Sequence, residues 1–285
     1  MSDFRVDKIT NRDGSAGTQI CGVSTFSGTS GMQLPAGPTE YRGGRGRGLF
    51  GSGANPSAIN VIDMIEIATK GNSTDFGDDN LVRQEGYAAF ASPTRGVFGG
   101  GYISPGVNTK DIAYVTISSQ GGVSDFGNLD VAQSRNVGLS DSTRGISAGG
   151  AEPTNGRISY VTIASTGDST DYGDLTVARY GSGACASPTR GLIAGGNPNT
   201  NIIDYITIQT KGNAEDFGDL TDDPNHLVGC SNSTRGLFGG GQNPSNVDVI
   251  AYVTISSTGD VTDFGDLTVA RRFCMGLSDV HGGLG

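Results

Sequence analysis

Three short segments near the C-terminal end decide the fold: Arg235–Gly239 (RGLFG), Ala251–Ile255 (AYVTI) and Asp263–Asp266 (DFGD). Counterparts of all three occur five times in the 285-residue chain, always in this order. Successive Arg-Gly segments are separated by 45 to 49 residues. A period of this length with short strands predicts the blades of a β-propeller, because each blade is one small antiparallel sheet.

The spacing within the repeat shows which connections are fixed and which vary. The Arg-Gly column contains Arg47, Arg95, Arg144, Arg190 and Arg235. The column of the second segment contains Met64, Tyr114, Tyr160, Tyr205 and Tyr252, each 11 residues before the Asp that opens the third segment. Constant spacing is typical of hairpins whose register is fixed by cross-strand packing. Only the connection between the first two segments varies by several residues, and it contains Pro56, Pro105, Pro153, Pro198 and Pro244, which predicts a surface loop.

Each repeat is predicted to form four strands. The first precedes the Arg-Gly turn, the second is the Gly-rich segment, the third carries the Tyr and the fourth begins at Asp-Phe-Gly-Asp. Second to fourth strands exist for five repeats, and one additional first strand lies at residues 272–278. We therefore expect an all-β, five-bladed propeller over residues 45–285. In it the C-terminal strand closes blade one, and an extended N-terminal arm at residues 1–44 precedes the ring.

The composition agrees with this fold class and excludes others. The chain has 48 Gly and no Trp, and only 17% of its residues are charged, which excludes a coiled coil. No apolar run reaches the roughly 18 to 20 residues of a membrane span. A net charge of −10 disfavours contact with phosphate backbones. The mixed charge of Met1–Arg5 is unlike a secretory signal, and four scattered Cys form no disulfide scaffold. We expect no nucleic-acid or membrane partner and folding in a reducing cytoplasm.

Over residues 45–285 the repeat resembles the kelch repeat, with its strand, turn, apolar-Gly-Gly segment, Tyr strand and aromatic outer element. The outer aromatic position, usually Trp in kelch blades, holds Phe76, Phe126, Tyr172, Phe217 and Phe264. Ser233–Gly241 (STRGLFGGG) and Thr262–Leu267 (TDFGDL) resemble kelch-like structural proteins of marine cyanobacterial phages. In the arm, Val6–Arg12 and Met32–Pro35 are similar to the N-termini of cyanophage virion and fibre proteins. The resemblance implies a tail-, neck- or fibre-type virion protein.

The repeated charged residues are the most conspicuous candidates for chemistry. The carboxylates are Asp75, Asp78, Asp125, Asp171, Asp174, Asp216, Asp219, Asp263 and Asp266. Paired carboxylates bind Ca²⁺ or act as acid and base, but recurrence in every repeat and the turn-capping habit of Asp favour a structural role. The neighbouring Arg column predicts a ring of ion pairs with these acids.

The remaining reactive residue types do not form a recognisable site. Cys185 and Cys230 occupy the first-strand position of Phe90, Leu139 and Leu277, which indicates apolar packing. The two histidines, His226 and His281, lie 55 residues apart and fit neither the ligand spacing of a zinc site nor a triad. We therefore expect a protein that is not an enzyme and that needs no cofactor or metal.

The leading functional hypothesis is a non-enzymatic virion structural protein whose arm attaches the propeller to the tail, neck or capsid. The arm is too Gly-rich to bury a core alone and is expected to order on other phage virion proteins. Its predicted anchoring residues are Phe4, Val6, Ile9, Ile20, Phe26, Met32 and Leu34. The hypothesis places the protein in the virion, assembled in the host cytoplasm, and leaves homo-oligomerisation through the arm open.

The alternative hypothesis is a host-surface glycan-binding lectin or adhesin that uses the variable loops. Asn amides and Tyr rings suit sugar hydroxyls and sugar faces, and variable contacts are often placed on loops of a rigid scaffold. The candidate residues are Asn55, Tyr102, Pro105, Asn108, Asn155, Asn199 and Asn243. A polysaccharide depolymerase is a third hypothesis, which the lack of a unique acid pair outside the repeats disfavours.

Overall fold

The computed structural model describes residues 46–54, 57–67, 70–103, 106–274 and 276. Every regular element within these residues is a β-strand, and the 22 strands form six antiparallel sheets of three or four strands. The predicted all-β class is therefore confirmed. The N-terminal arm lies outside the described residues, together with its predicted anchoring side chains Phe4, Val6, Ile9, Ile20, Phe26, Met32 and Leu34.

Five of the six sheets follow the sequence repeat, and we number them in chain order. Sheet 1 contains β1 (Arg47–Ala54), β2 (Ala58–Glu66) and β3 (Thr74–Asp78). Sheet 2 contains β5 (Ala88–Ala91), β6 (Arg95–Gly99), β9 (Asp111–Thr116) and β10 (Ser124–Asn128). Sheet 3 contains β11 (Val137–Ser140), β12 (Arg144–Gly150), β13 (Asn155–Thr162) and β14 (Thr170–Asp174).

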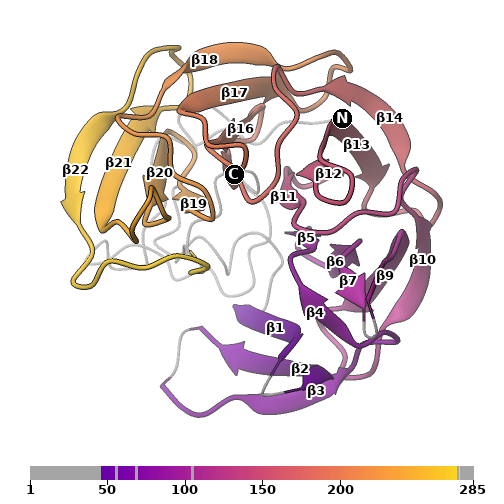
Figure 1. Ribbon diagram of the computed structural model, residues 1–285. Coiled ribbons are helices and arrows are strands. Elements are labelled where there is room, and N and C mark those ends of the chain that lie inside the picture. The colour runs from indigo at the N-terminus through magenta and orange to yellow at the C-terminus, as the bar shows by residue number, and fades with distance from the viewer. Residues whose placement is uncertain (1–45, 55–56, 68–69, 104–105, 275, 277–285) are drawn as a thin grey trace, which may run out of the picture. The chain divides into compact units, whose positions relative to one another are not determined.

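Sheet 4 contains β15 (Gly183–Ala186), β16 (Arg190–Ala194), β17 (Ile202–Thr207) and β18 (Glu215–Asp219). Sheet 5 contains β19 (Val228–Ser231), β20 (Arg235–Gly239), β21 (Val249–Thr254) and β22 (Thr262–Asp266). The five sheets succeed one another around a common centre, with β5, β11 and β19 toward the centre and β10, β14, β18 and β22 at the outside (Figure 1). The predicted four-strand order is present in sheets 2 to 5, and this arrangement is compatible with a β-propeller.

Sheet 1 has three strands in the described part of the chain, and its predicted fourth strand at 272–278 falls largely outside it. Residues 275, 277 and 278 are not described, and residues 272–274 and 276 form no strand there. Gly276 nevertheless lies beside β19, where an added Cβ would be 3.0 Å from Gly229 O. Gly138 of β11 approaches Ala89 of β5 in the same close manner. The last described residue therefore occupies the place of a next inner strand.

The variable connection of the second repeat is more ordered than the sequence predicts. It contributes β7 (Tyr102–Ile103) and β8 (Val107–Asn108), which pair with each other, and β7 also pairs with β4 (Arg83–Glu85). The Pro-containing sequence of this connection predicts a loop without strands. It is the longest of the five, which leaves enough chain for it to fold back on itself as a hairpin.

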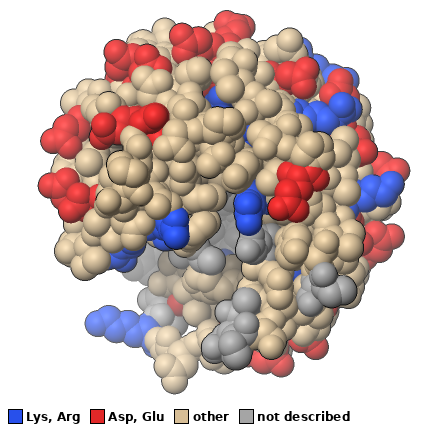
Figure 2. Space-filling model, in the orientation of Figure 1, with Lys and Arg blue, Asp and Glu red and all other residues tan. Residues whose placement is uncertain are grey.

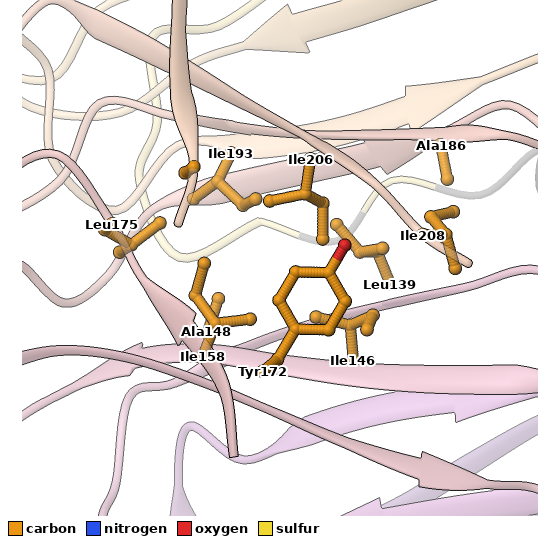
Figure 3. Packing of buried hydrophobic residues seen from close by; sticks show 11 residues of the cluster. Leu139, Ile146, Ala148, Ile158, Tyr172, Leu175, Ala186, Ile193, Ile206 and Ile208 are labelled. Atoms are coloured by element: carbon orange, nitrogen blue, oxygen red, sulfur yellow. The ribbon is translucent and has the colours of Figure 1, made fainter. Parts of the chain in front are cut away.

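Apolar side chains from facing sheets fill the space between them. Figure 3 shows one such layer, in which Ile146 and Ile158 of sheet 3 face Ile193 and Ile206 of sheet 4. All four are fully or almost fully buried. Full burial of such a side chain contributes roughly 1.5–3 kcal/mol, so these layers are the main attraction between sheets. Most residues of the third strands are buried or half-buried, and the Thr at the end of β9, β13, β17 and β21 is exposed, which agrees with the prediction that both faces of this strand are covered.

Glycine determines how closely the outer edges of the sheets approach. In each Asp-Phe-Gly-Asp element or its counterpart, the aromatic residue lies at a β-bulge and has no partner in the register of the ladder. The Gly that follows it has a positive φ. The Gly173 backbone lies against Gly212 O of the next hairpin, and a Cβ there would overlap that oxygen. The amide of Gly212 also donates to Tyr172 O at 3.0 Å. Three other joints repeat this contact: Gly121 N to Phe76 O, Gly167 N to Phe126 O and Gly259 N to Phe217 O.

Substitution of Gly173 by Ala therefore tests the close approach. Gly167 is a matched control because its φ is also 153°, yet no described atom lies within 4 Å of its added Cβ. Both variants incur backbone strain of about 1–3 kcal/mol, and only Gly173→Ala also pushes two sheets apart. We expect Gly173→Ala to lower the free energy of unfolding by at least about 1 kcal/mol more than Gly167→Ala, measured by urea denaturation. Equal losses would show that the close approach contributes nothing.

Candidate functional site

The Arg column does not form the predicted ring of ion pairs with the repeated Asp residues. Four of the five Arg reach across to the next sheet and donate to a backbone carbonyl. The four bonds run from Nη1 of Arg47, Arg95, Arg144 and Arg190 to the oxygens of Ile117, Ile163, Ile208 and Ile255, over 2.7–3.0 Å. The prediction is wrong because the acceptors belong to the backbone, which leaves no trace in the residue types.

The same Arg side chains also lie over the repeated Tyr rings. The guanidinium carbon of Arg144 is 4.3 Å from the centre of the Tyr160 ring, and the Arg95, Arg190 and Arg235 contacts are 4.4–4.5 Å. Cation–π contacts of this kind add about 0.5–2 kcal/mol and hold the guanidinium in place. Arg47 has Met64 in the Tyr position and instead pairs with Glu66 at 3.1 Å.

The repeated acids play a local structural part. Asp75, Asp125, Asp171, Asp216 and Asp263 are all exposed. The carboxylates of Asp216 and Asp263 accept bonds of 3.2 Å from Gly218 N and Gly265 N, which caps their own turns as Asp commonly does. Hairpin residues complete the joints: Asp168, Asn213 and Asp260 accept from backbone amides of the preceding outer strand at 2.8–3.1 Å. These contacts agree with the structural role predicted for the acids.

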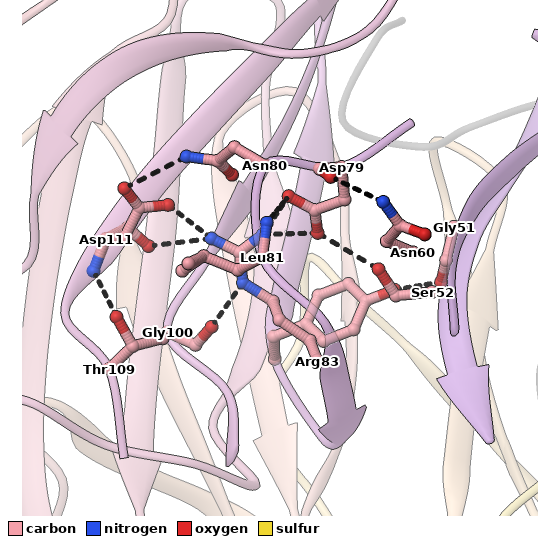
Figure 4. Close-up of polar contacts among 11 residues, drawn as sticks. Gly51, Ser52, Asn60, Asp79, Asn80, Leu81, Arg83, Gly100, Thr109 and Asp111 are labelled. Atoms are coloured by element: carbon pink, nitrogen blue, oxygen red, sulfur yellow. Dashed lines mark hydrogen bonds and ion pairs between the residues drawn. The ribbon is translucent and has the colours of Figure 1, made fainter. Parts of the chain in front are cut away.

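One buried ion-pair network joins sheets 1 and 2. Arg83 is fully buried, and Figure 4 shows its guanidinium between the carboxylates of Asp79 and Asp111. Its Nε donates to Gly100 O at 3.0 Å, and Ser52 donates to Asp79. A fully paired buried cation is costly to disrupt, because loss of one partner leaves a buried charge. The charged groups of the network bond to one another, and these bonds fix the crossing segment between the two sheets.

All variable loops lie on one side of the sheets. In every sheet the second strand runs toward this side and the third runs away from it, so the second-to-third connections gather there with the segments that cross to the next sheet. Loops and crossing segments are joined by repeated backbone bonds: Gly101 N to Gln133 O, Gly150 N to Arg179 O, Gly196 N to Pro224 O and Gly241 N to Arg271 O, all 2.8–3.1 Å. We call this side the loop face.

A chain of backbone hydrogen bonds runs around the centre of the loop face. Phe273 N donates to His226 O, His226 N to Gly181 O, Gly181 N to Arg135 O and Arg135 N to Gly86 O, at 2.5–3.1 Å. One residue comes from each crossing segment, and all five have φ between 33° and 65°. Sequence reasoning missed this column because its members share a backbone conformation and no residue type.

Aromatic and basic side chains stack along this chain. The ring centres of His226 and Phe273 are 4.1 Å apart, and those of His226 and Tyr180 are 6.2 Å apart. Arg135 lies over Tyr180 and Arg272 over Phe273, at 5.6 and 5.1 Å. The stack places aromatic rings and the guanidinium groups of Arg135 and Arg272 at the centre of the loop face. On the face shown in Figure 2 the acidic residues gather toward the outer edge, while several basic residues lie nearer the central hollow.

An apolar cavity of about 380 Å³ lies between the innermost strands. Its lining includes Leu49, Phe90, Leu139, Cys185 and Cys230. Gly276 also lines it, so the last described residue and β1 border the same space. Cys185 is buried and its sulfur lies 2.6 Å from where a Cβ on Gly236 would be, as Leu139 lies 2.7 Å from one on Gly191. The predicted apolar packing of Cys185 is confirmed, and Cys230 is partly exposed.

The described members of the predicted sugar-binding set lie on the loop face, and most of their side chains bond to neighbouring loops. Asn55 and Pro105 lie outside the described residues. Asn108 donates to Ala151 O and Glu152 O of the next loop, Asn155 donates to Pro153 O, and Asn243 donates to Asp223. Asn199 accepts from Asn225 at 2.7 Å. Tyr102 is partly buried in β7. Most of these amides therefore hold neighbouring loops together.

Asn199 also borders an open polar hollow, which sequence reasoning did not identify. The hollow has a volume of about 410 Å³ and is lined by Asn199, Thr200, Asn201, Thr221, Asp222 and Asp223. Amides, hydroxyls and carboxylates on one concave surface are suited to binding a polyol or a sugar. No group of three or more His, Cys, Asp or Glu side chains in the described segments is arranged to hold a metal ion.

Comparisons with known proteins add no family to this description. The chain matches no protein-family model, and it matches no curated protein sequence. None of the described residues forms a helix that is long and apolar enough to cross a membrane.

Cysteine reactivity tests the packing around the cavity. Burial raises the pKa of the Cys185 thiol well above its ordinary value, and burial also raises the pKa of Cys230. Because only the thiolate reacts, we expect Cys185 to resist iodoacetamide at pH 8 in the folded protein, while Cys230 reacts slowly. Peptide mass spectrometry before and after urea denaturation measures both rates. Rapid alkylation of Cys185 in the folded state would contradict this packing.

Proposed function

We propose that the chain is a non-enzymatic virion structural protein, in which a propeller is attached through its N-terminal arm to the tail, neck or capsid. The observation that carries this proposal is the use of the repeated charged residues. The Arg column bonds to carbonyls of the next sheet, and hairpin Asp and Asn side chains bond to backbone amides. Polar groups bonded to the backbone of neighbouring sheets stabilise a rigid body, and such a body is suited to binding other proteins in an assembly.

We also propose the finer architecture, a five-bladed kelch-like propeller in which the C-terminal strand closes blade one. Two observations support it. The chain of backbone bonds from Gly86 to Phe273 has one member per repeat and five members in all. Gly276 lies beside β19 and borders the same cavity as Leu49 of β1, so an inner strand continuing from it would reach the open edge of sheet 1.

The virion assignment rests on the resemblance of the repeats and the arm to cyanophage structural proteins. The proposed partners are other virion proteins, bound by the arm residues Phe4, Val6, Ile9, Ile20, Phe26, Met32 and Leu34. Apolar residues spaced through a Gly-rich segment order only when a partner supplies the surface that covers them. Assembly in the host cytoplasm and contact with the host surface belong to the same proposal.

Deletion of residues 1–44 tests attachment. We expect the shortened protein to keep the β-rich circular dichroism spectrum and melting temperature of the full chain and to be absent from purified particles, measured by mass spectrometry. The matched control is the full chain with Asp75→Asn, an exposed change on the outer strand, which should still be incorporated. Incorporation of the shortened protein at the level of the full chain would refute the tether.

The polar hollow beside Asn199 favours a second function, binding of a host-surface glycan. Asp222 and Thr221 are exposed on the hollow and are not required by any joint between sheets. They could accept and donate bonds to sugar hydroxyls without disturbing the scaffold.

A glycan array with the full chain tests this second function. Binding that falls at least tenfold in Asp222→Ala, with an unchanged melting temperature, would support it. The control is Asp125→Ala, an exposed acid on β10 of sheet 2 that does not line the hollow, which should leave binding unchanged. No binding on the array at high protein concentration would exclude it.

A further inference from the structure

Sheet 5 carries an exposed face whose counterparts in the other sheets are covered. The outer aromatic residues Phe76, Phe126, Tyr172 and Phe217 are 2–3% exposed, because the following sheet packs on each of them. Phe264, the fifth member of the column, is 52% exposed. Gly265 has no described atom within 4 Å of its added Cβ, whereas a Cβ on Gly173 would overlap the next hairpin. On sheet 1, Ile67 is 45% exposed, whereas Ile163, Ile208 and Ile255 at the same position of the repeat are 0–1% exposed. The face of sheet 5 and the face of sheet 1 thus present the two unfilled halves of one repeated joint.

We propose that these faces join within the same chain and that Arg271 pairs with Asp63 across the joint. The inference rests on the proposed ring and names the side chains that close it. The other joints supply the expected contacts: Gly71 N donates to Phe264 O, and Arg235 donates to Ile67 O. A joint of this kind already exists in four copies, so every part of the fifth has a counterpart in the structure.

The pair that joins sheets 3 and 4 is the template. Arg179 and Asp204 are both fully buried, with Nη2 and Oδ2 3.0 Å apart. Thr176 donates to the same carboxylate from its amide at 3.0 Å and from its hydroxyl. Arg179 also donates to Ile193 O at 3.1 Å. Burial lowers the pKa of Arg179, and the Asp204 carboxylate opposes that shift and keeps the guanidinium charged.

The sequence repeats this template at only one other place. Residues 174–179 and 266–271 are identical, Asp-Leu-Thr-Val-Ala-Arg. Both arginines bond to the carbonyl two residues earlier, Arg179 to Val177 O and Arg271 to Val269 O. The second segment therefore has the same residues and the same local conformation as the first, with Thr268 in the place of Thr176.

The facing position changes in step with the segment. The residue immediately before the Tyr or Met of the third strand is Asp63, Ala113, Ser159, Asp204 and Ala251 in the five repeats. Asp204 faces the first Asp-Leu-Thr-Val-Ala-Arg segment, and in a ring of five the second segment faces Asp63. Where the crossing segment has Gln133 or Pro224 in place of Arg, the facing residue is Ser159 or Ala251. The crossing from sheet 1 carries Arg83, which pairs with Asp79 and Asp111 while Ala113 holds the facing position. An acid therefore occurs at this position only in the two repeats that follow an Asp-Leu-Thr-Val-Ala-Arg segment in the proposed ring order.

Joining within one chain is favoured over joining to a second copy. Both faces belong to the same body, so their effective concentration for each other is in the millimolar range, far above the concentration of another copy. The crossing segment that carries Arg271 is already placed by two bonds on its own side, Gly241 N to Arg271 O and Phe273 N to His226 O. It is therefore directed along the same path around the centre as the four earlier crossings.

Two sets of variants of the full chain test the joint. Asp204→Asn disrupts the pair that the structure contains and should lower the melting temperature by roughly 5 °C or more. We expect Asp63→Asn to cause a comparable loss, and Arg271→Met combined with Asp63→Asn to lose less than the sum of the single changes. In the second set, Gly265→Ala should be as damaging as Gly173→Ala, whereas a face open to water would make it as mild as Gly167→Ala.

Hydrogen exchange on the unmodified chain provides a measurement that does not depend on variant folding. We expect the amide of Gly71 to be protected like those of Gly121, Gly167, Gly212 and Gly259, at protein concentrations where the chain is monomeric. Rapid exchange at Gly71, or additive effects of the Asp63 and Arg271 changes, would overturn the proposal. Protection that disappears on dilution of an oligomer would also overturn it, since the joint would then link two copies. Neither experiment involves particles or glycans, so its failure is distinct from failure of the proposed function.

Discussion

The approach of glycine to a neighbouring carbonyl at the outer edge of each sheet is the constraint on which the other contacts depend. Two backbones can approach this closely only where the residue has no Cβ. The next sheet therefore lies near enough to bury the aromatic side chain beside the glycine. At the inner end the Arg-Gly glycines do the same for side chains of the preceding sheet, such as Leu139 over Gly191. Because contact is made at both ends of each strand pair, the spacing between sheets is fixed and the apolar layers between them can pack without voids.

This way of building a joint separates the two sides of the molecule in their tolerance of change. Opposite the loop face lie the third-to-fourth hairpins and the Arg-Gly turns, and both are committed to neighbouring sheets through backbone bonds. The loop face carries the connections that vary in length, and the repeated part of their attachment is the bond from the glycine amide at their base. A loop can therefore lengthen, as it does around β7 and β8, without moving the strands below it.

The fold was more accessible from the sequence than the roles of its polar residues. Period, alternation and turn chemistry are local properties, so the strands, the hairpins and the packing of Cys185 could be predicted. The role of the Arg column could not, because a nearby column of acids suggested ion pairs while the true acceptors, such as Ile208 O, are backbone atoms. The buried partners Arg83 and Asp111 are 28 residues apart with no shared motif, and only the folded chain brings them together. The polar hollow was likewise missed, since its lining comes from two connections that are neighbours only in space.

The chain of backbone bonds around the centre of the loop face has a consequence for how this protein can diversify. Gly86, Arg135, Gly181, His226 and Phe273 all have a positive φ, yet they include two glycines, an arginine, a histidine and a phenylalanine. Since each hydrogen bond needs only an amide and a carbonyl, the side chain at any of these positions can change without loss of the bond. A left-handed backbone conformation at a non-glycine residue lowers the free energy of unfolding by about 1 kcal/mol, which is small beside the contribution of the packed sheets. The side chains at these five positions can therefore be substituted one at a time, and the surface chemistry at the centre of the loop face can change while the sheets that support it stay the same.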